Sequence, residues 1–256
     1  MQMNLHVIAS GSSGNCYMIN NNGHYIFIDA GATLTAIKKS LDNIKTAEKV
    51  SLFVTHEHND HISGIMPLIK SFSPKIYSSY GTASYLEHKG VPCESIYTIN
   101  DSCIYDMGDF TVTPFKIFHD AAEPFGYKFD FGNTVISFAT DLGIVTDDLY
   151  KTVEGSTVLL LESNYEDELL KENKKYPEYL KQRIRSKYGH LSNKDAFQFA
   201  GELSKNKLKN CFLGHVSENN NSYELLEKYA DAYLNTFNIE TKVLRQKQKE
   251  KTVFNI

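Results

Sequence analysis

Short apolar runs, turn residues and helical patterns alternate along both halves of the chain. In the first part, Leu5 to Ala9, Cys16 to Ile19 and Tyr25 to Ile28 are separated by clusters of Gly, Ser and Asn, which predicts strands joined by tight turns. Thr33 can cap a helix with apolar residues at helical spacing, and a buried strand, Val50 to Val54, follows it. The N-terminal half therefore starts as a sheet with a helix beside it. The apolar positions of that first helix are Leu34, Ile37, Leu41 and Ile44.

The rest of the chain also mixes strands with helices. Two halves that each mix strands with helices predict an α/β (α+β) fold. In this fold, a four-layer αββα sandwich, two mixed β-sheets pack face to face and helices cover both outer faces. Since no low-complexity linker interrupts the chain, we expect a single domain over residues 1–256. The expected strands are Lys75 to Tyr77, Phe110 to Phe118, Phe125 to Phe131, Thr134 to Ala139, Thr157 to Leu161, Asn210 to Leu213 and Ile239 to Val243, and the expected helices are Ile62 to Phe72, Thr82 to His88, Glu166 to Lys187, Asn193 to Lys205 and Tyr223 to Asn235.

The composition is that of a folded, water-soluble protein. Hydrophobic residues make up 41% and charged residues 23% of the chain, which is close to the average for globular proteins. No apolar run approaches the roughly 18 residues that a membrane-spanning helix needs. The cysteines contain no Cys-x-x-Cys pair, which fits reduced thiols, so we expect a cytoplasmic protein without a membrane partner. These cysteines are Cys16, Cys93, Cys103 and Cys211.

Three imidazoles and one carboxylate lie within six residues directly after an apolar strand. At a period of two, His56 and His58 lie on one side of an extended backbone, where both can bind one metal ion. Asp60 and His61 then turn toward a second metal-binding position. Four ligand-type side chains at this spacing are a specific signal, which outweighs the alternative of a polar surface turn with histidines present by chance. The segment therefore predicts a metal-dependent hydrolase.

A two-metal site needs further ligands from remote strand ends that are followed by turn residues. His119 ends the strand Phe110 to Phe118, Asp141 precedes Leu142-Gly143, and His215 follows the strand near Cys211. Taken singly, each is more often an ordinary surface or core residue. Taken together, they complete two coordination spheres.

In order, these positions resemble the five motifs of the metallo-β-lactamase-fold hydrolases, and the resemblance spans most of the chain. Asp29 matches the first motif, the segment His56 to His61 the second, and His119, Asp141 and His215 the remaining three. The resemblance implies the metallo-β-lactamase fold and Asp29 as a group that supports the ligands. It also implies that His56, His58 and His119 hold one metal, that Asp60, His61 and His215 hold another, and that Asp141 bridges them.

Two further segments narrow the resemblance to the nuclease branch of this fold. Leu160 to Asn164 and Gly189 to Asn193 look like its carboxylate and Gly-His-Ser/Thr motifs, which implies Glu162 and His190 as a proton-transfer pair. The sequence departs in one place, because the histidine that usually precedes this carboxylate is Leu161. The alternatives are that His190 is a polar residue at a helix start and that Glu162 is an exposed strand end.

The whole set most closely resembles the YycJ-like subgroup of bacterial proteins, described as 5′-to-3′ DNA exonucleases. The segments Ala9 to Asn15 and His119 to Pro124 add to this match. In such a site Asp60 could orient a metal-bridging hydroxide, and His190, backed by Glu162, could protonate the departing oxygen. The resemblance therefore implies a nucleic-acid substrate, with DNA favoured.

A local basic segment supports this substrate, although the chain as a whole carries a net charge of -4. From Lys171 to Lys187 there are seven basic and two acidic side chains, which leaves +5. Its candidate substrate contacts are Lys181, Arg183 and Arg185. The interspersed Tyr176, Tyr179 and Tyr188 are either stacking platforms for bases or one apolar helix face, and the basic residues are either phosphate contacts or a solvated helix face.

Several functional alternatives stay open. One is a tRNA 3′-processing-like endoribonuclease, and another is a thioester or lactone hydrolase of the glyoxalase II type, because a dinuclear centre alone does not identify the substrate. A nonenzymatic binding protein ranks last, because all seven ligand positions are filled. We expect two divalent ions, zinc or manganese with iron as a third candidate, and the sequence predicts no oligomeric state.

Overall fold

The computed structural model describes residues 3–41, 49–246 and 252–256. The chain divides into two compact units, each built on a seven-stranded sheet. Unit 1 comprises Met1–Asn100, Ala121–Phe125 and Gln246–Ile256, and unit 2 comprises Asp101–Asp120 and Gly126–Arg245. In the part of the chain that the structure describes, no helix is both long and apolar enough to cross a membrane.

The sheet of unit 1 is mixed. Its strands β14, β1, β2 and β3 pair antiparallel, whereas β3, β4, β5 and β6 run parallel. The parallel strands place the chain segments that follow β3 and β4 at the same edge of the sheet. In spatial order the strands are β14 (Thr252–Asn255), β1 (Asn4–Ala9), β2 (Cys16–Asn21), β3 (His24–Ile28), β4 (Lys49–Phe53), β5 (Lys75–Ser78) and β6 (Ile96–Thr98).

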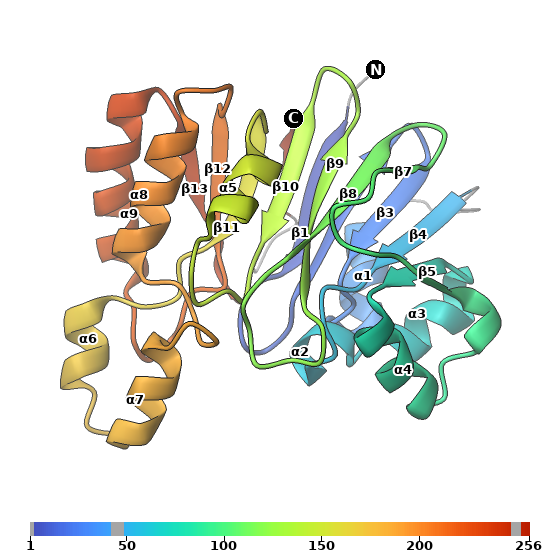
Figure 1. The fold of residues 1–256 in the computed structure, drawn as a ribbon, viewed down its shortest axis with the longest axis horizontal. Coiled ribbons are helices and arrows are strands. Elements are labelled where there is room, and N and C mark those ends of the chain that lie inside the picture. The colour runs from blue at the N-terminus through green and yellow to red at the C-terminus, as the bar shows by residue number, and fades with distance from the viewer. Residues whose placement is uncertain (1–2, 42–48, 247–251) are drawn as a thin grey trace. The chain divides into compact units, whose positions relative to one another are not determined.

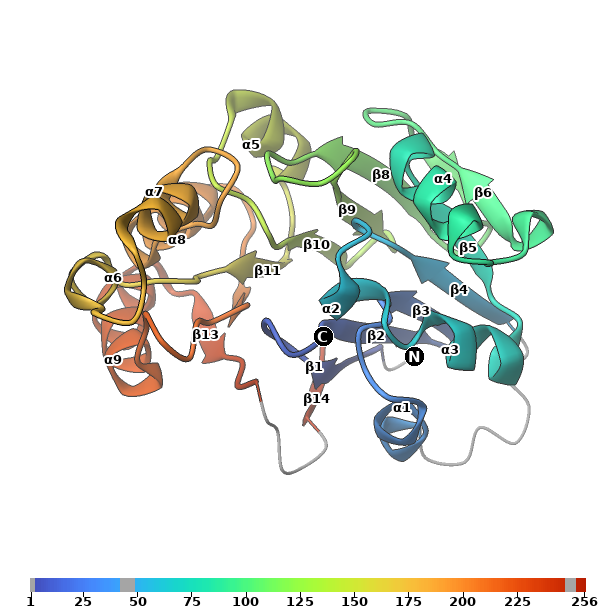
Figure 2. The same cartoon turned by 90° about the horizontal axis from the view of Figure 1, so that it is seen from below.

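Helices cover one face of this sheet. Ile37, Leu68 and Leu86, from three different helices, join one buried cluster with Phe27 and Leu52 of the strands. Figure 2 shows α3 and α4 beside β5. The helices are α1 (Leu34–Ser40), α2 (Asn59–Ile62), α3 (Ile65–Phe72) and α4 (Tyr80–His88), with a short 3-10 turn at Cys93–Ser95. Ile44, the last apolar position expected in the first helix, lies outside the described residues.

The helix expected from Ile62 to Phe72 is interrupted, so that prediction was wrong at its start. The amide of Gly64 donates a hydrogen bond of 2.7 Å to the carbonyl oxygen of Ala30. A Cβ atom at position 64 would lie only 2.1 Å from the Ala32 carbonyl oxygen. The chain after β3 therefore passes so close that only glycine fits, and α3 has to begin after it.

The sheet of unit 2 repeats the mixed arrangement. β10, β11, β12 and β13 run parallel, and β9 pairs with β10 antiparallel, as β7 does with β8. In spatial order the strands are β13 (Glu240–Val243), β12 (Asn210–Gly214), β11 (Val158–Glu162), β10 (Val135–Ala139), β9 (Phe125–Asp130), β8 (Thr111–Lys116) and β7 (Tyr105–Asp106).

Three helices cover one face of the second sheet. Leu149, Phe199 and Leu226 of these helices pack in one cluster with Leu159 and Leu213 of the strands, and α8 and α9 lie side by side next to β12 and β13 (Figure 1). The helices of unit 2 are α5 (Asp147–Val153), α6 (Asp167–Glu172), α7 (Glu178–Arg185), α8 (Asn193–Leu203) and α9 (Tyr223–Tyr233), with a 3-10 turn at Leu234–Phe237.

Two features of unit 2 differ from the sequence predictions. The helical segment expected from Glu166 to Lys187 is a pair of short helices, because Pro177 caps the second one and proline cannot continue the first. Helix α5 was not predicted, although Thr146 followed by two aspartates is a start signal, and its side chain accepts a hydrogen bond from the Leu149 amide. The short strand β14 was also missed.

Candidate metal centre

The end of β3 places a buried carboxylate beneath the histidine segment. Asp29 is fully buried and accepts hydrogen bonds from the Thr55 amide (2.8 Å), the Thr55 hydroxyl (2.8 and 3.0 Å) and Nδ1 of His61 (2.7 Å). Burial raises the pKa of the Asp29 carboxyl, and the contacts with His61 and Thr55 oppose that rise. A carboxylate that binds one ring nitrogen of a histidine directs the other toward a metal. The Asp29 carboxylate therefore fixes the orientation of the His61 ring, and its role in supporting a metal ligand stays a prediction.

The loop after β4 and the start of α2 carry the four unit 1 candidates. Nδ1 of His56 lies 3.0 Å from the Thr55 hydroxyl, so Thr55 contacts the rings of both His56 and His61. The ring of His56 lies 4.6 Å from that of His58 and 4.0 Å from that of His61, centroid to centroid. Helix α2 begins just after His58, so Asp60 and His61 lie on helical backbone and not on extended backbone. The two geometries predicted for this segment, extended and then turned, are both present.

The Gly/Ser-rich loop contributes a contact that the sequence analysis did not single out. Nδ2 of Asn15 lies 3.0 Å from Nε2 of His61 and donates a hydrogen bond of 3.2 Å to Asp60. The backbone of Asn15 also bonds to the carbonyl of Asp60 and to the amide of Gly31. This loop thus fixes two candidate ligands, and an Asn at the end of a Gly/Ser turn was its only sequence signal.

In unit 2, three candidate ligands stand at strand ends and are buried. Asp141 follows β10 and His215 follows β12, both with left-handed backbone (φ 55° and 52°). Non-glycine residues in this conformation are uncommon and concentrate at functional sites. His119 follows β8, and its Nδ1 lies 3.1 Å from the carbonyl oxygen of Gly189. Oδ1 of Asp141 lies 3.8 Å from Nε2 of His119 and 3.4 Å from Nδ1 of His215.

Glu162 is completely buried at the end of β11, so the alternative of an exposed strand end is wrong. Its Oε1 contacts Nδ1 of His190 at 2.8 Å and Nδ1 of His215 at 2.6 Å. Its Oε2 accepts hydrogen bonds from the amides of Leu142 (3.0 Å) and Leu191 (3.1 Å). The carboxylate therefore accepts hydrogen bonds from four donors and fixes the orientation of two imidazoles.

The neighbouring charges set the protonation of Glu162 and His190. Burial alone raises the pKa of Glu162, but His190 and His215 outweigh burial and hold the pKa below its ordinary value. Burial by itself lowers the pKa of His190, but the attraction of the Glu162 carboxylate is larger than this effect, so the pKa of His190 is raised. The side chain of His190 is 23% exposed, whereas those of Glu162 and His215 are buried. His190 is thus the member of the cluster that solvent or substrate can reach.

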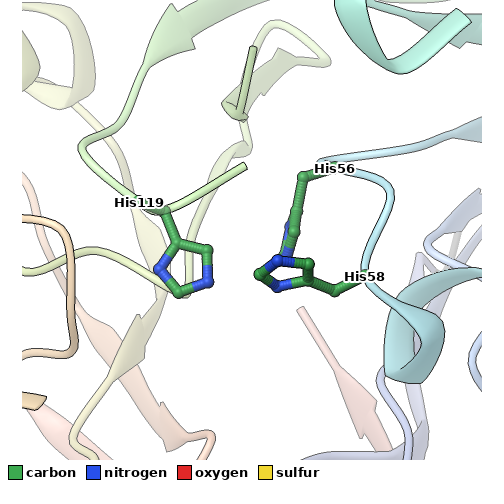
Figure 3. A group of neighbouring side chains, drawn as sticks. All are labelled: His56, His58 and His119. Carbon is green, nitrogen blue, oxygen red and sulfur yellow. The ribbon is translucent and has the colours of Figure 1, made fainter. Parts of the chain in front are cut away.

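The donor set suits divalent transition metals, because imidazole nitrogens and carboxylate oxygens are the ligands that zinc and manganese accept. In unit 2, Asp141, Glu162, His190 and His215 each offer a ligand atom within 4.8 Å of the others. Figure 3 draws His56 and His58 of unit 1 and His119 of unit 2, the three residues that the resemblance assigns to one ion.

The three candidate substrate contacts are engaged within unit 2. Lys181 is mostly buried, and its Nζ donates to the carbonyl oxygen of Lys171 at 2.6 Å. Nε of Arg183 donates a hydrogen bond of 2.8 Å to Asp120, and Arg185 contacts Asp167. These contacts stabilise the α6 and α7 segment, and a role in substrate binding stays a prediction.

The three tyrosines of the basic segment have different surroundings. Tyr176 packs against the small cluster of Tyr165, Leu170 and Ile184, as the alternative of an apolar face proposed. Tyr179 is 74% exposed and Tyr188 is 45% exposed. The segment is therefore not a single aromatic face.

A cavity of about 480 Å³ opens near the start of α5 and α8. Leu191, the neighbour of His190, lines it together with Tyr150 and Phe199. Three acidic residues, Asp147, Asp195 and Glu202, also line it. A cavity with several carboxylates disfavours the phosphates of a nucleic acid, because like charges repel.

Two mixed sheets, each with helices on one face and with imidazoles and carboxylates at its strand ends, are typical of a class of metal-dependent hydrolases. The chain belongs to the β-lactamase superfamily, since the model of the beta-lactamase superfamily domain matches residues 24–209. It is 32% identical to exodeoxyribonuclease YycJ of Bacillus anthracis over 231 residues, which cover 88% of this chain and 86% of that protein. It is also 32% identical to exodeoxyribonuclease WalJ of Streptococcus pneumoniae, covering 86% and 83%.

Solved structures agree with the fold. The metallo-β-lactamase fold protein YhfI from Bacillus subtilis matches with a TM-score of 0.74 at 17% identity and covers 99% of both chains. The short form of human tRNase Z matches with a TM-score of 0.65 at 18% identity and also covers 99% of both. The predictions of the metallo-β-lactamase fold class, of the superfamily and of a metal-dependent hydrolase are confirmed.

Proposed function

We propose that this hydrolase is a dinuclear-metal phosphodiesterase and, most specifically, a 5′-to-3′ DNA exonuclease. The observation that carries the phosphodiesterase is the buried Glu162, which orients the partly exposed His190 beside His215. Hydrolysis of a phosphodiester needs a group that protonates the departing oxygen. The similarity to two proteins named exodeoxyribonucleases supports DNA as the substrate.

We further propose that the candidate ligands divide between two divalent ions, zinc or manganese, with iron as a third candidate. One ion would be held by His56, His58 and His119 and the other by Asp60, His61 and His215, and Asp141 would contribute to both. When bound, the ions supply Lewis-acid activation of water and stabilise charge on phosphate oxygens.

The protein's own groups complete the reaction. Nδ1 of His190 faces Glu162, which leaves its Nε2 as the atom that donates a proton to the leaving oxygen. Because the carboxylate raises the pKa of His190, the imidazole keeps this proton at neutral pH more readily than an isolated histidine does. Asp60, which Asn15 holds through a hydrogen bond, orients the attacking water.

The substrate test uses metal-stripped protein to which manganese or zinc is returned. The substrates are end-labelled single-stranded DNA, duplex DNA, RNA and a simple thioester. We expect release of mononucleotides from the 5′ end of DNA. Rapid turnover of the thioester with inert nucleic acids would indicate a hydrolase of the glyoxalase II type, and internal cleavage of RNA alone would indicate a tRNA-processing-like endoribonuclease.

Two histidine variants separate metal binding from proton transfer. We expect His58→Ala to lose metal, and His190→Ala to keep its metal but to hydrolyse DNA about 10²- to 10⁴-fold more slowly. The matched control is His88→Ala, since His88 lies exposed at the end of α4. Full activity of His190→Ala would remove His190 from the mechanism.

A further inference from the structure

Three exposed side chains flank the imidazoles of His119 and His190 in unit 2. Phe118 directly precedes His119, and Lys187 and Tyr188 precede the Gly189-His190 pair. Phe118 is 36% exposed and Tyr188 is 45% exposed, although each lies next to a buried residue. We call Phe118, Lys187 and Tyr188 the aromatic platform.

Hydrogen bonds fix this platform to the backbone that carries the two imidazoles. Nδ1 of His119 lies 3.1 Å from the carbonyl oxygen of Gly189, which joins the loop of Phe118 to the loop of Tyr188. The carbonyl oxygen of Phe118 accepts a hydrogen bond of 3.0 Å from Gly143, and the rings of His119 and His190 lie 5.3 Å apart. The backbone segments that carry the platform and the two imidazoles are therefore joined to each other.

Two aromatic rings and a cation make up the platform. The ring centroids of Phe118 and Tyr188 lie 6.0 Å apart at an interplanar angle of 40°. Nζ of Lys187 lies 4.9 Å from the centroid of Tyr188 and 6.0 Å from that of Phe118. Exposed rings offer stacking surface to any base, and an adjacent lysine offers a charge to its phosphate, as in sites that bind single strands.

We propose that the aromatic platform is a nucleobase subsite, which stacks the base next to the scissile phosphate while Lys187 contacts a backbone phosphate. This inference rests on the proposed nuclease function. The carboxylates that line the cavity near α5 and α8 repel phosphates, so the strand's backbone is directed toward Lys187. A stacked base has to be unpaired, so the subsite favours single-stranded or frayed ends over blunt duplexes.

The test moves a single abasic residue, one position at a time, inward from the degraded end of a single-stranded oligonucleotide. In the wild type we expect one position at which base loss raises KM about 5- to 160-fold, the range of one base–aromatic stack. Tyr188→Leu and Phe118→Leu keep apolar bulk but lose a ring, so this position effect should shrink. Tyr188→Phe should retain it. The matched control is Tyr229→Leu, since Tyr229 is a tyrosine of α9 that is 41% exposed, close to the exposure of Tyr188.

The cation has a separate readout. Lys187→Gln should weaken binding to all sequences alike and reduce the salt dependence of binding by about one counterion. Lys194→Gln, a change at an exposed lysine of α8, should leave the salt dependence unchanged.

The outcomes distinguish this inference from the proposed function. If no nucleic acid is hydrolysed, the proposed function fails. If DNA is hydrolysed but the wild type shows no position effect, the subsite is overturned and the nuclease stands. An unchanged position effect in both Leu variants, with thermal unfolding like that of the wild type, also overturns it.

Discussion

Replacing Glu162 with Gln removes a charge and one acceptor oxygen from a buried group that serves four donors. In the structure Oε1 meets the Nδ1 atoms of His190 and His215, and Oε2 meets two backbone amides. The oxygen of a glutamine can accept from only one of these pairs, and its amide nitrogen has to face the other. The orientation of lower free energy keeps the glutamine oxygen on the two backbone amides, because a buried N–H without an acceptor costs about 1–3 kcal/mol.

The amide nitrogen of Glu162→Gln then faces the two imidazoles. Each imidazole has to present an unprotonated Nδ1 to it, so the ring proton moves to Nε2. In His215, Nδ1 contacts Glu162, so we expect Nε2 to bind the metal, and a neutral ring that is protonated at Nε2 is a poor ligand. We therefore expect metal affinity to fall about 10- to 100-fold and the free energy of unfolding to fall by about 1–3 kcal/mol.

The two effects of this variant are measured separately. Competition with a chelator gives the metal affinity, and urea unfolding of metal-free protein gives the free energy of unfolding. The matched control is Glu154→Gln, since Glu154 is exposed and its carboxylate accepts a hydrogen bond from Asn206 that an amide oxygen can replace. Wild-type metal affinity together with stability within about 0.5 kcal/mol of wild type would refute the reasoning.

Three further predictions follow from buried groups. Asp29→Asn should reduce both metal affinity, about 10- to 100-fold, and stability, because an amide oxygen cannot accept from all three donors, the Thr55 amide, the Thr55 hydroxyl and Nδ1 of His61; wild-type values in chelator competition and urea unfolding would contradict this. Lys181→Met should lower the free energy of urea unfolding by about 0.5–1.5 kcal/mol without changing the salt dependence of DNA binding, whereas a changed salt dependence would support a substrate contact. Burial raises the pKa of Cys211 to about 12, and burial together with Asp29 raises that of Cys16 still further. Both thiols should therefore stay protonated and unreactive at pH 8 and react only well above it. A thiol reagent should modify two cysteines rapidly and all four after denaturation, and rapid reaction of all four in the folded protein would contradict the structure. The exposed pair is Cys93 and Cys103.

Local sequence patterns were sufficient where one segment carried the whole signal. The capped helix at Thr33, the strands before His56 and Asp141 and the helix after Ser192 were all predictable, because apolar periodicity and caps act over a few residues. The break at Gly64 was not predictable, because it depends on the carbonyls of Ala30 and Ala32, which lie over 30 residues earlier in the chain. The expectation of a single domain stays a prediction.

The sequence alone determined which side chains are available as ligands and in what order they occur, from His56 to His215. It could do so because ligand types at strand ends follow from local composition. Only the tertiary structure decided that Glu162 is buried between His190 and His215 and that Phe118 lies beside Tyr188. These pairs are separated by 28 residues or more, and their contacts depend on how strands far apart in sequence come together in one sheet, which no local pattern encodes.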